Sequence, residues 1–105
     1  MRRFWALAVL MTALPALAQD DAAALRIRAL AANCAGCHGT EGRAPADSLV
    51  PGLAGMPSAY FIMQMKSFQT GARQGTLMPQ LAKGFSEAQV AQLAQYFAAQ
   101  KGAGK

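Results

Sequence analysis

Apolar side chains recur at three- and four-residue spacing in three parts of the chain, which is the pattern of a helix that buries one face. The first part covers about residues 20–33, the second runs from residue 57 or 58 to about residue 70, and the third begins at Ser86. Their apolar positions are Ile27, Leu30, Ala31 and Cys34; Phe61, Met65 and Phe68; and Val90, Leu93, Ala94 and Phe97. No stretch alternates apolar and polar residues for long enough to indicate a strand. The sequence therefore predicts an all-α fold with three main helices separated by loops.

The second and third predicted helices have recognisable ends. Pro57 suits the first turn of a helix, and Gly71 can adopt the left-handed conformation that ends one. Ser86 and Gln89 have the spacing of a capping box, in which each side chain accepts a hydrogen bond from the other residue's backbone N–H. On the second helix, Gln69 is expected on the side that faces water.

The N-terminal segment has the features of a secretory signal peptide. Arg2 and Arg3 give it a positive start, and residues 4–14 are apolar except for Thr12. The sequence Ala16-Leu17-Ala18 then has the small-x-small pattern that signal peptidase accepts. Cleavage is therefore predicted to leave Gln19 as the first mature residue.

This cleavage divides the chain into a signal peptide, residues 1–18, and one small domain, residues 19–105. The alternative is an uncleaved membrane anchor, but crossing the bilayer takes about 20 apolar residues. The apolar run here is shorter and contains Pro15. We therefore expect no membrane span in the mature form and a periplasmic location, or its equivalent, where cysteines are also able to form disulfides.

The charge balance argues against a nucleic-acid partner. The whole chain has a formal net charge of +5, and loss of Arg2 and Arg3 with the signal peptide lowers it by two. The remaining basic residues are scattered and form no run of the kind that binds nucleic acid.

The sequence Cys34-Ala35-Gly36-Cys37-His38 has the C-x-x-C-H spacing of c-type haem attachment. Two thiols at this spacing can add to the two vinyl groups of one porphyrin, and the adjacent imidazole can then ligate the iron. His38 is the only histidine in the chain. The alternatives are a dithiol oxidoreductase, whose motif normally follows a strand, and a zinc site, which here lacks a fourth Cys or His ligand. The motif therefore predicts one covalent haem c.

A second axial ligand would have to come from methionine or another nitrogen side chain, or be absent. Removal of the signal peptide leaves Met56, Met63, Met65 and Met78. Met63 and Met65 fall within the second predicted helix, where methionine is usually a core filler. Met56 and Met78 each precede a proline in or beside a loop, and spacing alone leaves both open.

In their order along the chain, these motifs resemble a class I cytochrome c. They are Cys34-Ala35-Gly36-Cys37-His38, Pro51-Gly52-Leu53-Ala54-Gly55, Thr76-Leu77-Met78-Pro79 and Tyr96-Phe97. The resemblance covers essentially the whole predicted mature chain and implies a small fold wrapped around one haem, in which the first and last helices pack together. It implies that Met78 is the second ligand of the iron. It also implies that the carbonyl of Pro51 accepts a hydrogen bond from Nδ1 of His38.

Residues 51–97 are similar to the haem domains of cytochrome c4 and to the cytochrome subunit of flavocytochrome c sulfide dehydrogenase. Diheme relatives have two attachment motifs, whereas this chain has one. The resemblance implies a periplasmic one-electron carrier with His/Met-ligated haem c, which is not itself an enzyme. The alternative is the cytochrome subunit of such a dehydrogenase, passing electrons from the flavin to an acceptor. A haem protein with an open sixth position is a third class, but no second histidine is present to build a distal site.

The expected partners are therefore redox proteins, with a flavoprotein subunit in the alternative. Three basic residues lie near the second helix and the segment around Met78, and they are expected to contribute to docking or to neutralise the haem propionates. They are Lys66, Arg73 and Lys83. Three apolar residues would provide a flavoprotein interface if they are exposed, and otherwise belong to the core: Tyr60, Ile62 and Phe85.

Overall fold

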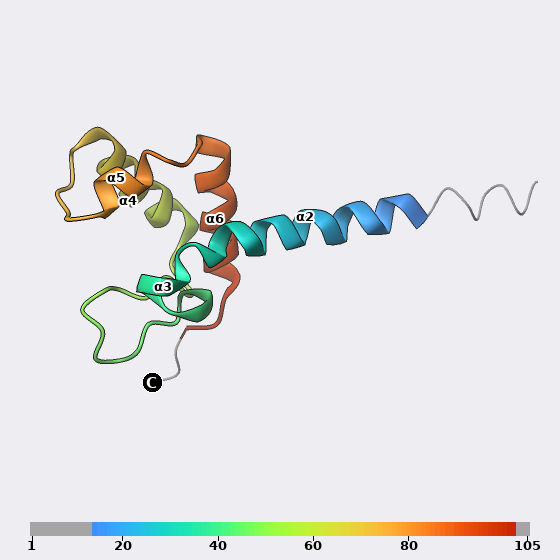
Figure 1. The fold of residues 1–105 in the computed structure, drawn as a ribbon, viewed down its shortest axis with the longest axis horizontal. Helices are drawn as coiled ribbons and strands as arrows, with labels where there is room; N and C mark the ends of the chain where they lie inside the picture. The colour runs from blue at the N-terminus through green and yellow to red at the C-terminus, as the bar shows by residue number, and fades with distance from the viewer. Residues whose placement is uncertain (1–13, 103–105) are drawn as a thin grey trace, which may run out of the picture.

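The computed structural model describes residues 14–102, which form a set of helices joined by loops (Figure 1). The elements are α2 (Leu14–Ala32), α3 (Ala35–His38), the 3-10 helix η1 (Thr40–Gly42), α4 (Ser58–Thr70), α5 (Met78–Ala82) and α6 (Glu87–Ala99). No strand occurs within the described range. The predicted all-α class is confirmed.

Helix α2 is longer than the sequence pattern predicted, because it begins at Leu14 rather than near Asp20. Alanine and leucine, which are strong helix formers, dominate its first turns, and Pro15 is tolerated in the first turn of a helix. The predicted cleavage point after Ala18 therefore lies inside a continuous helix. The first part of α2 extends away from the other helices (Figure 1), and the predicted signal residues 1–13 lie outside the described residues.

The second and third predicted helices are confirmed as α4 and α6. Gly71 ends α4 with φ 82° and ψ 4°, the left-handed conformation expected there. At the start of α6, the Gln89 backbone N–H donates to Ser86 Oγ at 3.1 Å, and the Ser86 backbone N–H donates to Gln89 Oε1 at 2.9 Å. The predicted capping box is therefore present.

Two short α-helices and the 3-10 helix η1 were not predicted. Helix α3 contains Cys37 and His38, and α5 begins at Met78 with Pro79 in its first turn. Met78 was expected in or beside a loop, and it is the first residue of this five-residue helix, directly after the loop 71–77. Four or five residues are too few to show a helical period, so pattern analysis cannot detect such elements.

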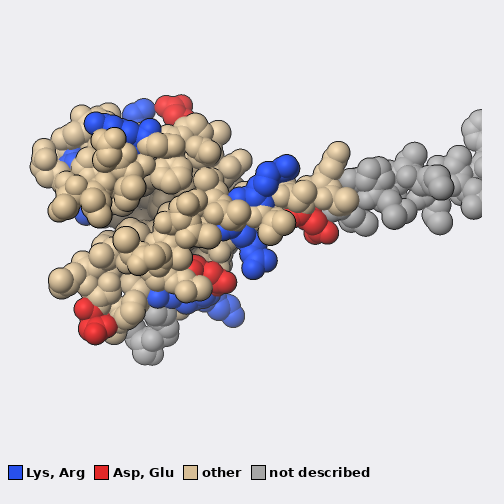
Figure 2. Space-filling model, in the orientation of Figure 1, with Lys and Arg blue, Asp and Glu red and all other residues tan. Residues whose placement is uncertain are grey.

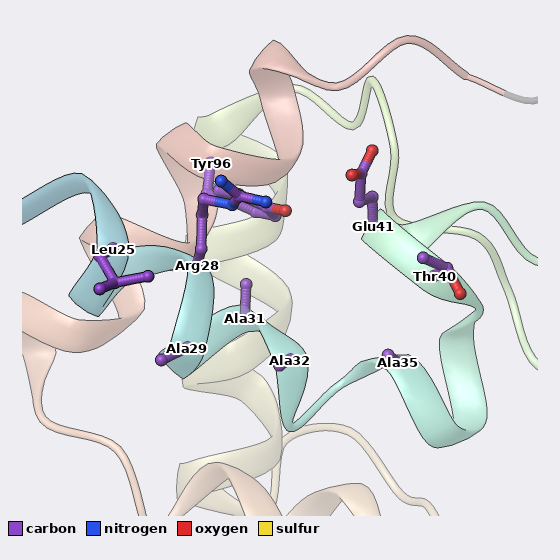
Figure 3. A pocket seen from close by; sticks show the side chains of 9 residues that line it. All are labelled: Leu25, Arg28, Ala29, Ala31, Ala32, Ala35, Thr40, Glu41 and Tyr96. Atoms are coloured by element: carbon purple, nitrogen blue, oxygen red, sulfur yellow. The ribbon is translucent and has the colours of Figure 1, made fainter. Parts of the chain in front are cut away.

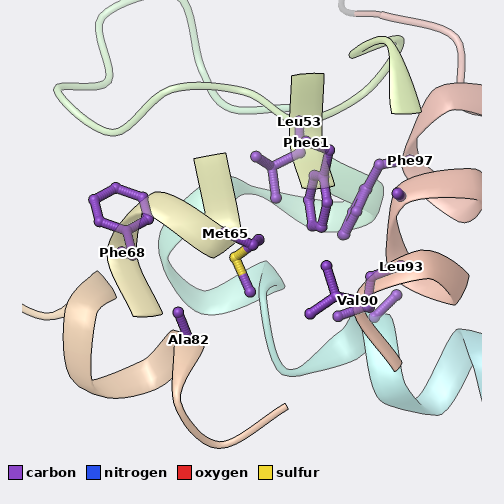
Figure 4. Packing of buried hydrophobic residues seen from close by; sticks show 10 residues of the cluster. Leu53, Phe61, Met65, Phe68, Ala82, Val90, Leu93 and Phe97 are labelled. Carbon is purple, nitrogen blue, oxygen red and sulfur yellow. The ribbon is translucent and has the colours of Figure 1, made fainter. Parts of the chain in front are cut away.

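The core lies where α4 packs against α5 and α6, and α2 crosses α6 as expected for the first and last helices. Its buried members are Ala31, Leu53, Phe61, Met65, Phe68, Ala82, Val90, Leu93, Ala94 and Phe97 (Figure 4). The rings of Phe61 and Phe97 stack with centroids 5.7 Å apart, which joins α4 to α6. Of the four apolar positions predicted for the first helix, Ala31 is buried, and Ile27, Leu30 and Cys34 are half-buried.

Two expectations for α4 were wrong. Met63 is 53% exposed, whereas Met65 is 6% exposed and belongs to the core. Gln69 does not face water: it is half-buried, and its Nε2 donates to the carbonyl oxygens of Ala82 at 2.8 Å and Phe85 at 3.3 Å. The helical period gives the direction of each side chain around the helix axis. Which of these directions is buried depends on where the neighbouring helix α5 packs.

Within residues 14–102, none of the helices combines the length and the apolar character needed to cross a membrane.

Candidate functional site

The C-x-x-C-H segment turns tightly at the end of α2. The backbone N–H of Cys34 donates to Ala31 O at 3.0 Å, and that of His38 donates to Cys34 O at 2.9 Å, which winds the segment into α3. Asn33 Nδ2 donates to Leu30 O at 2.9 Å and so satisfies a carbonyl at the end of α2. Both cysteines are free thiols; Cys34 is half-buried and Cys37 is exposed. Burial raises the pKa of the Cys34 thiol, which therefore remains protonated at neutral pH.

The imidazole of His38 is anchored by a backbone carbonyl thirteen residues further along the chain. Its Nδ1 lies 2.6 Å from Pro51 O, the contact that the resemblance implied. Because a carbonyl oxygen only accepts, this contact requires the proton on Nδ1 and leaves the Nε2 lone pair free. The ring therefore has the tautomer and the fixed orientation that a metal ligand needs.

The segment that carries Pro51 is closed by Gly42, a residue that the sequence analysis did not single out. Gly42 O accepts hydrogen bonds from the backbone N–H groups of Leu53 at 2.8 Å and Ala54 at 3.1 Å. Gly42 has φ 78°, and a Cβ there would lie 2.9 Å from atoms of Leu53, Ala54 and Phe97. Only glycine fits this position without displacing its neighbours. The contact that places Pro51 beside His38 therefore depends on Gly42.

Met78 and Met56 are both half-buried and both pack against the core. Met56 belongs to the segment that anchors His38, because its backbone N–H donates to Leu53 O at 3.1 Å. Met78 lies on a separate element, α5, which packs on α4. The two methionines therefore lie in different parts of the fold, Met56 with the segment that anchors His38 and Met78 on α5.

The surface is hollowed between the part of the molecule that contains α4 and α5 and the part that contains α3 (Figure 2). In this view, the side chains around the hollow are mostly uncharged. Large apolar side chains are exposed close in sequence to Pro51 and Met78. They are Leu49, two residues before Pro51, and Leu77 and Leu81, which flank Met78.

These residues fit a covalently attached haem. The two thiols have the spacing to form thioethers with its vinyl groups, and the Nε2 of His38 is free to ligate iron. An apolar ring system between α3 and α5 would be in contact with side chains that are otherwise exposed to water.

A separate pocket of about 380 Å³ lies between α2, η1 and the aromatic ring of Tyr96 (Figure 3). Its walls include three alanines of α2, with Arg28 on one side and Glu41 on the other. It contains none of the predicted site residues.

The residues proposed for partner docking have different surroundings. Lys66 Nζ lies 3.6 Å from Glu87 Oε1 in an exposed ion pair, whereas Lys83 is exposed at the end of α5. Tyr60 is 46% exposed and Ile62 is 40% exposed, while Phe85 is half-buried against the core. Two of the three apolar candidates are therefore on the surface.

A family model described as "Cytochrome C oxidase, cbb3-type, subunit III" matches residues 18–97. A relative named thiosulfate dehydrogenase electron acceptor, from Thiomonas intermedia, is 41% identical over 75 residues. The cytochrome subunit of sulfide dehydrogenase from Chlorobaculum tepidum is 35% identical over 68 residues, and cytochrome c4 from Pseudomonas aeruginosa is 38% identical over 91 residues.

These alignments cover most of this chain but less than two thirds of each relative. They include 71%, 65% and 87% of this chain in the same order, and 35%, 60% and 43% of the three relatives. Each relative therefore contains a substantial part that has no counterpart in the aligned residues.

Proposed function

The chain belongs to the cytochrome c family, and from this premise we propose that it is a one-electron carrier that is not itself an enzyme. The cofactor of the family is a covalently attached haem c. In this chain, Cys34 and Cys37 would form the two thioethers, and His38 and Met78 would be the axial ligands. Pro51 would orient His38 through its carbonyl.

The observation that carries the proposal is the contact between His38 Nδ1 and Pro51 O. A hydrogen bond from the ring nitrogen that does not bind the metal fixes a ligating histidine and increases the basicity of the nitrogen that does. His38 is half-buried, and the contact holds its ring in one orientation. The contact therefore supports His38 as a ligand rather than as a surface residue that happens to follow two cysteines.

The haem would supply a one-electron Fe(II)/Fe(III) couple, and the protein residues determine how that couple is used. A methionine sulfur from α5 would occupy the position opposite His38 and so exclude exogenous ligands from it. Methionine ligation also raises the reduction potential relative to two nitrogen ligands. His38 on α3 and Met78 on α5 would hold the iron from two elements, and two fixed protein ligands would limit structural change between the oxidation states, as fast electron transfer requires.

A second candidate is a cytochrome subunit within a dehydrogenase that oxidises an inorganic sulfur compound. The names of two relatives, a sulfide dehydrogenase subunit and an electron acceptor of thiosulfate dehydrogenase, favour this class of partner. In this second candidate, the partner subunit carries a flavin, and this chain would pass electrons from the flavin to an acceptor. The exposed side chains of Tyr60 and Ile62 provide apolar surface for a permanent interface.

The proposal includes export. Removal of residues 1–18 would release a periplasmic protein that begins at Gln19, an exposed residue of α2. Because the processing site is helical in the intact chain, the helix has to unwind around Ala18 before a peptidase can cleave there.

The test is a redox titration of the purified, haem-loaded protein. A carrier is expected to titrate reversibly with one electron, and its ferrous form is expected not to bind carbon monoxide. Rapid carbon monoxide binding by the native protein at neutral pH would contradict the carrier function and indicate an open iron site.

A further inference from the structure

The loop of residues 43–57, which joins η1 to α4 and carries Pro51, is fastened to the C-terminal part of the chain at two points. Near its beginning, Arg43 Nε donates to Lys101 O at 2.8 Å. Near its end, the backbone N–H of Gly55 donates to Phe97 O at 2.8 Å, in the last turn of α6. Both flanks of the loop are therefore held against the same stretch of chain.

Arg43 provides the side-chain part of this junction. Its Nη1 donates to the carboxylate of Glu41, and its backbone N–H donates to Thr40 O at 3.0 Å. The guanidinium thus joins a carboxylate of η1 to a carbonyl 58 residues further along the chain. A planar fork can hold two such partners in fixed directions, whereas a single ammonium group cannot.

Glu41 has a backbone conformation that directs attention to this pair. Its φ is 54° and its ψ is 26°, which is the left-handed region, and it is the only non-glycine residue within residues 14–102 with positive φ. A residue with a Cβ stays in this region only where its surroundings impose it, and such positions are concentrated at functional sites. The contact with Arg43 is one of the contacts that hold Glu41 in place.

Gly42 lies between these two charged residues and connects them to the histidine. Its carbonyl accepts from the backbone N–H groups of residues 53 and 54, and the carbonyl of Pro51 is the acceptor for His38 Nδ1. A Cβ at Gly52 would lie 3.2 Å from Gly42 O, so the backbone beside Pro51 lies directly against Gly42. A displacement of η1 at Arg43 would therefore reach the acceptor of the histidine through backbone contacts.

We propose that Arg43 is a positioning residue for the axial ligand His38. It holds η1 to the C-terminal segment, and this keeps Pro51 O at hydrogen-bonding distance from His38 Nδ1. The inference rests on the proposed function, because it concerns the ligation of haem iron. The hydrogen bond makes Nε2 a stronger donor and so favours the ferric state, which means that Arg43 lowers the reduction potential through His38.

The experiment compares haem-loaded Arg43→Gln and Arg26→Gln with the native protein. Both changes remove one positive charge, and this loss by itself disfavours the reduced state. Arg43→Gln is nevertheless expected to raise the equilibrium constant for reduction of the iron about threefold, because a weaker hydrogen bond leaves His38 a poorer donor to ferric iron. Arg26 is exposed on α2, so Arg26→Gln is expected to lower the constant by less than about twofold.

A second measurement reports the hydrogen bond itself. In the NMR spectrum of the ferric protein, the Nδ1 proton of His38 exchanges with solvent only when its bond to Pro51 O opens. Arg43→Gln is expected to exchange this proton about tenfold faster than the native protein, and Arg26→Gln at the native rate. An arginine that only stabilises the fold would lower the free energy of unfolding and leave the reduction constant unchanged.

Arg43→Lys covers the case in which Arg43→Gln does not fold. Lysine keeps the charge and can pair with Glu41, but it lacks the fork that also reaches Lys101 O. A constant raised about twofold and a faster proton exchange are expected. If every Arg43 variant that carries haem keeps the native constant and exchange rate, the assignment of Arg43 is wrong and the proposed function stands. If the native protein carries no covalent haem, the proposed function itself fails.

Discussion

The imidazole Nδ1 of His38 lies 2.6 Å from the carbonyl oxygen of Pro51, and this contact joins the end of α3 to a loop with no regular secondary structure. The pyrrolidine ring fixes φ of Pro51 and so limits the conformations that the loop can adopt at the acceptor. The loop is closed by Gly42, whose oxygen accepts from two consecutive backbone N–H groups. The orientation of the proposed ligand therefore depends on the closure of this loop through Gly42.

The first prediction concerns Gly42→Ala. The new methyl group would lie 2.9 Å from Leu53, Ala54 and Phe97 atoms, and the φ of 78° disfavours any side chain. We expect the free energy of unfolding of the haem-loaded protein to fall by about 2–3 kcal/mol, as measured by denaturant titration. Gly102→Ala is the matched control, because a Cβ there would meet only Ala54 O, at an ordinary contact distance of 3.7 Å. Equal stability losses in the two variants would show that closure at Gly42 is not required.

The second prediction concerns covalent attachment. Pigment should remain on the native chain after extraction with acidified acetone, and its mass should include one haem. The double variant Cys34→Ala, Cys37→Ala is expected to lose the pigment completely in the same extraction. Without haem, the chain is expected to lose most of its helical circular dichroism, because a small domain with a hollow beside its core buries too little surface to remain folded. Pigment that extracts from the native chain would contradict this prediction.

The third prediction concerns the ligand opposite His38. Met78→Ala should abolish the weak far-red band of sulfur-ligated ferric haem and allow the ferrous form to bind carbon monoxide. Met56→Ala should keep the band, because Met56 lies on the segment that anchors His38. The opposite result would indicate that Met56 is the ligand.

Two further methionines serve as controls for this experiment. Met65→Leu is expected to cost about 1 kcal/mol, because leucine has a similar volume at this buried site. Met63→Leu is expected to have almost no effect, since its side chain is mainly exposed. Both variants should retain the far-red band, and its loss in either would indicate that the band reports general packing rather than ligation.

The fourth prediction concerns Gln69. Its Nε2 donates to carbonyl oxygens at the end of α5 and beyond it, so it fixes the helix that begins with Met78. Gln69→Leu is expected to cost about 1–2 kcal/mol, because two partly buried carbonyls lose a donor. It should also increase the rate of carbon monoxide binding, as α5 becomes more mobile. Gln92→Leu on the exposed side of α6 is the control, and a carbon monoxide rate equal in the two variants would exclude a role for Gln69 in holding α5.

How far the sequence predicted the structure depends on how local the determining contacts are. The ends of α4 and α6 were predicted because Gly71 and the Ser86–Gln89 pair act within a few residues of themselves. Gln69 was expected to face water and Met63 to fill the core. Both expectations were wrong, because the packing of other elements on α4 decides which of its faces is covered. The role of Gly42 was not predicted, since its hydrogen bonds close a loop of about a dozen residues.

The site shows the same dependence. Cys34, Cys37 and His38 are recognisable because their chemistry requires a fixed local spacing. Pro51 and Met78 came from the resemblance to class I cytochromes, since no local pattern distinguishes them from an ordinary loop proline and methionine. Arg73 was one of three candidate cations, and no sequence pattern indicated its stacking on Phe68 or its hydrogen bond to Gln64.

The last prediction distinguishes a free carrier from a permanent subunit. A carrier has to dissociate after each electron transfer, so its complexes are weak and are steered by charge. We expect the native, haem-loaded protein to elute from gel filtration as a single chain at both low and high salt. Its electron transfer rate with a redox partner should fall as salt increases, because screening weakens the steering.

A permanent subunit behaves differently in the same measurements, because an obligate interface is large and apolar and persists in salt. Such an interface would include Tyr60 and Ile62, so the paired change to serine should release the subunit from its complex. In a free carrier, the same change alters only exposed side chains and should leave both elution and rate unchanged. A salt-resistant complex that contains flavin, and that the serine variant disrupts, would overturn the carrier function and make sulfide oxidation the principal candidate.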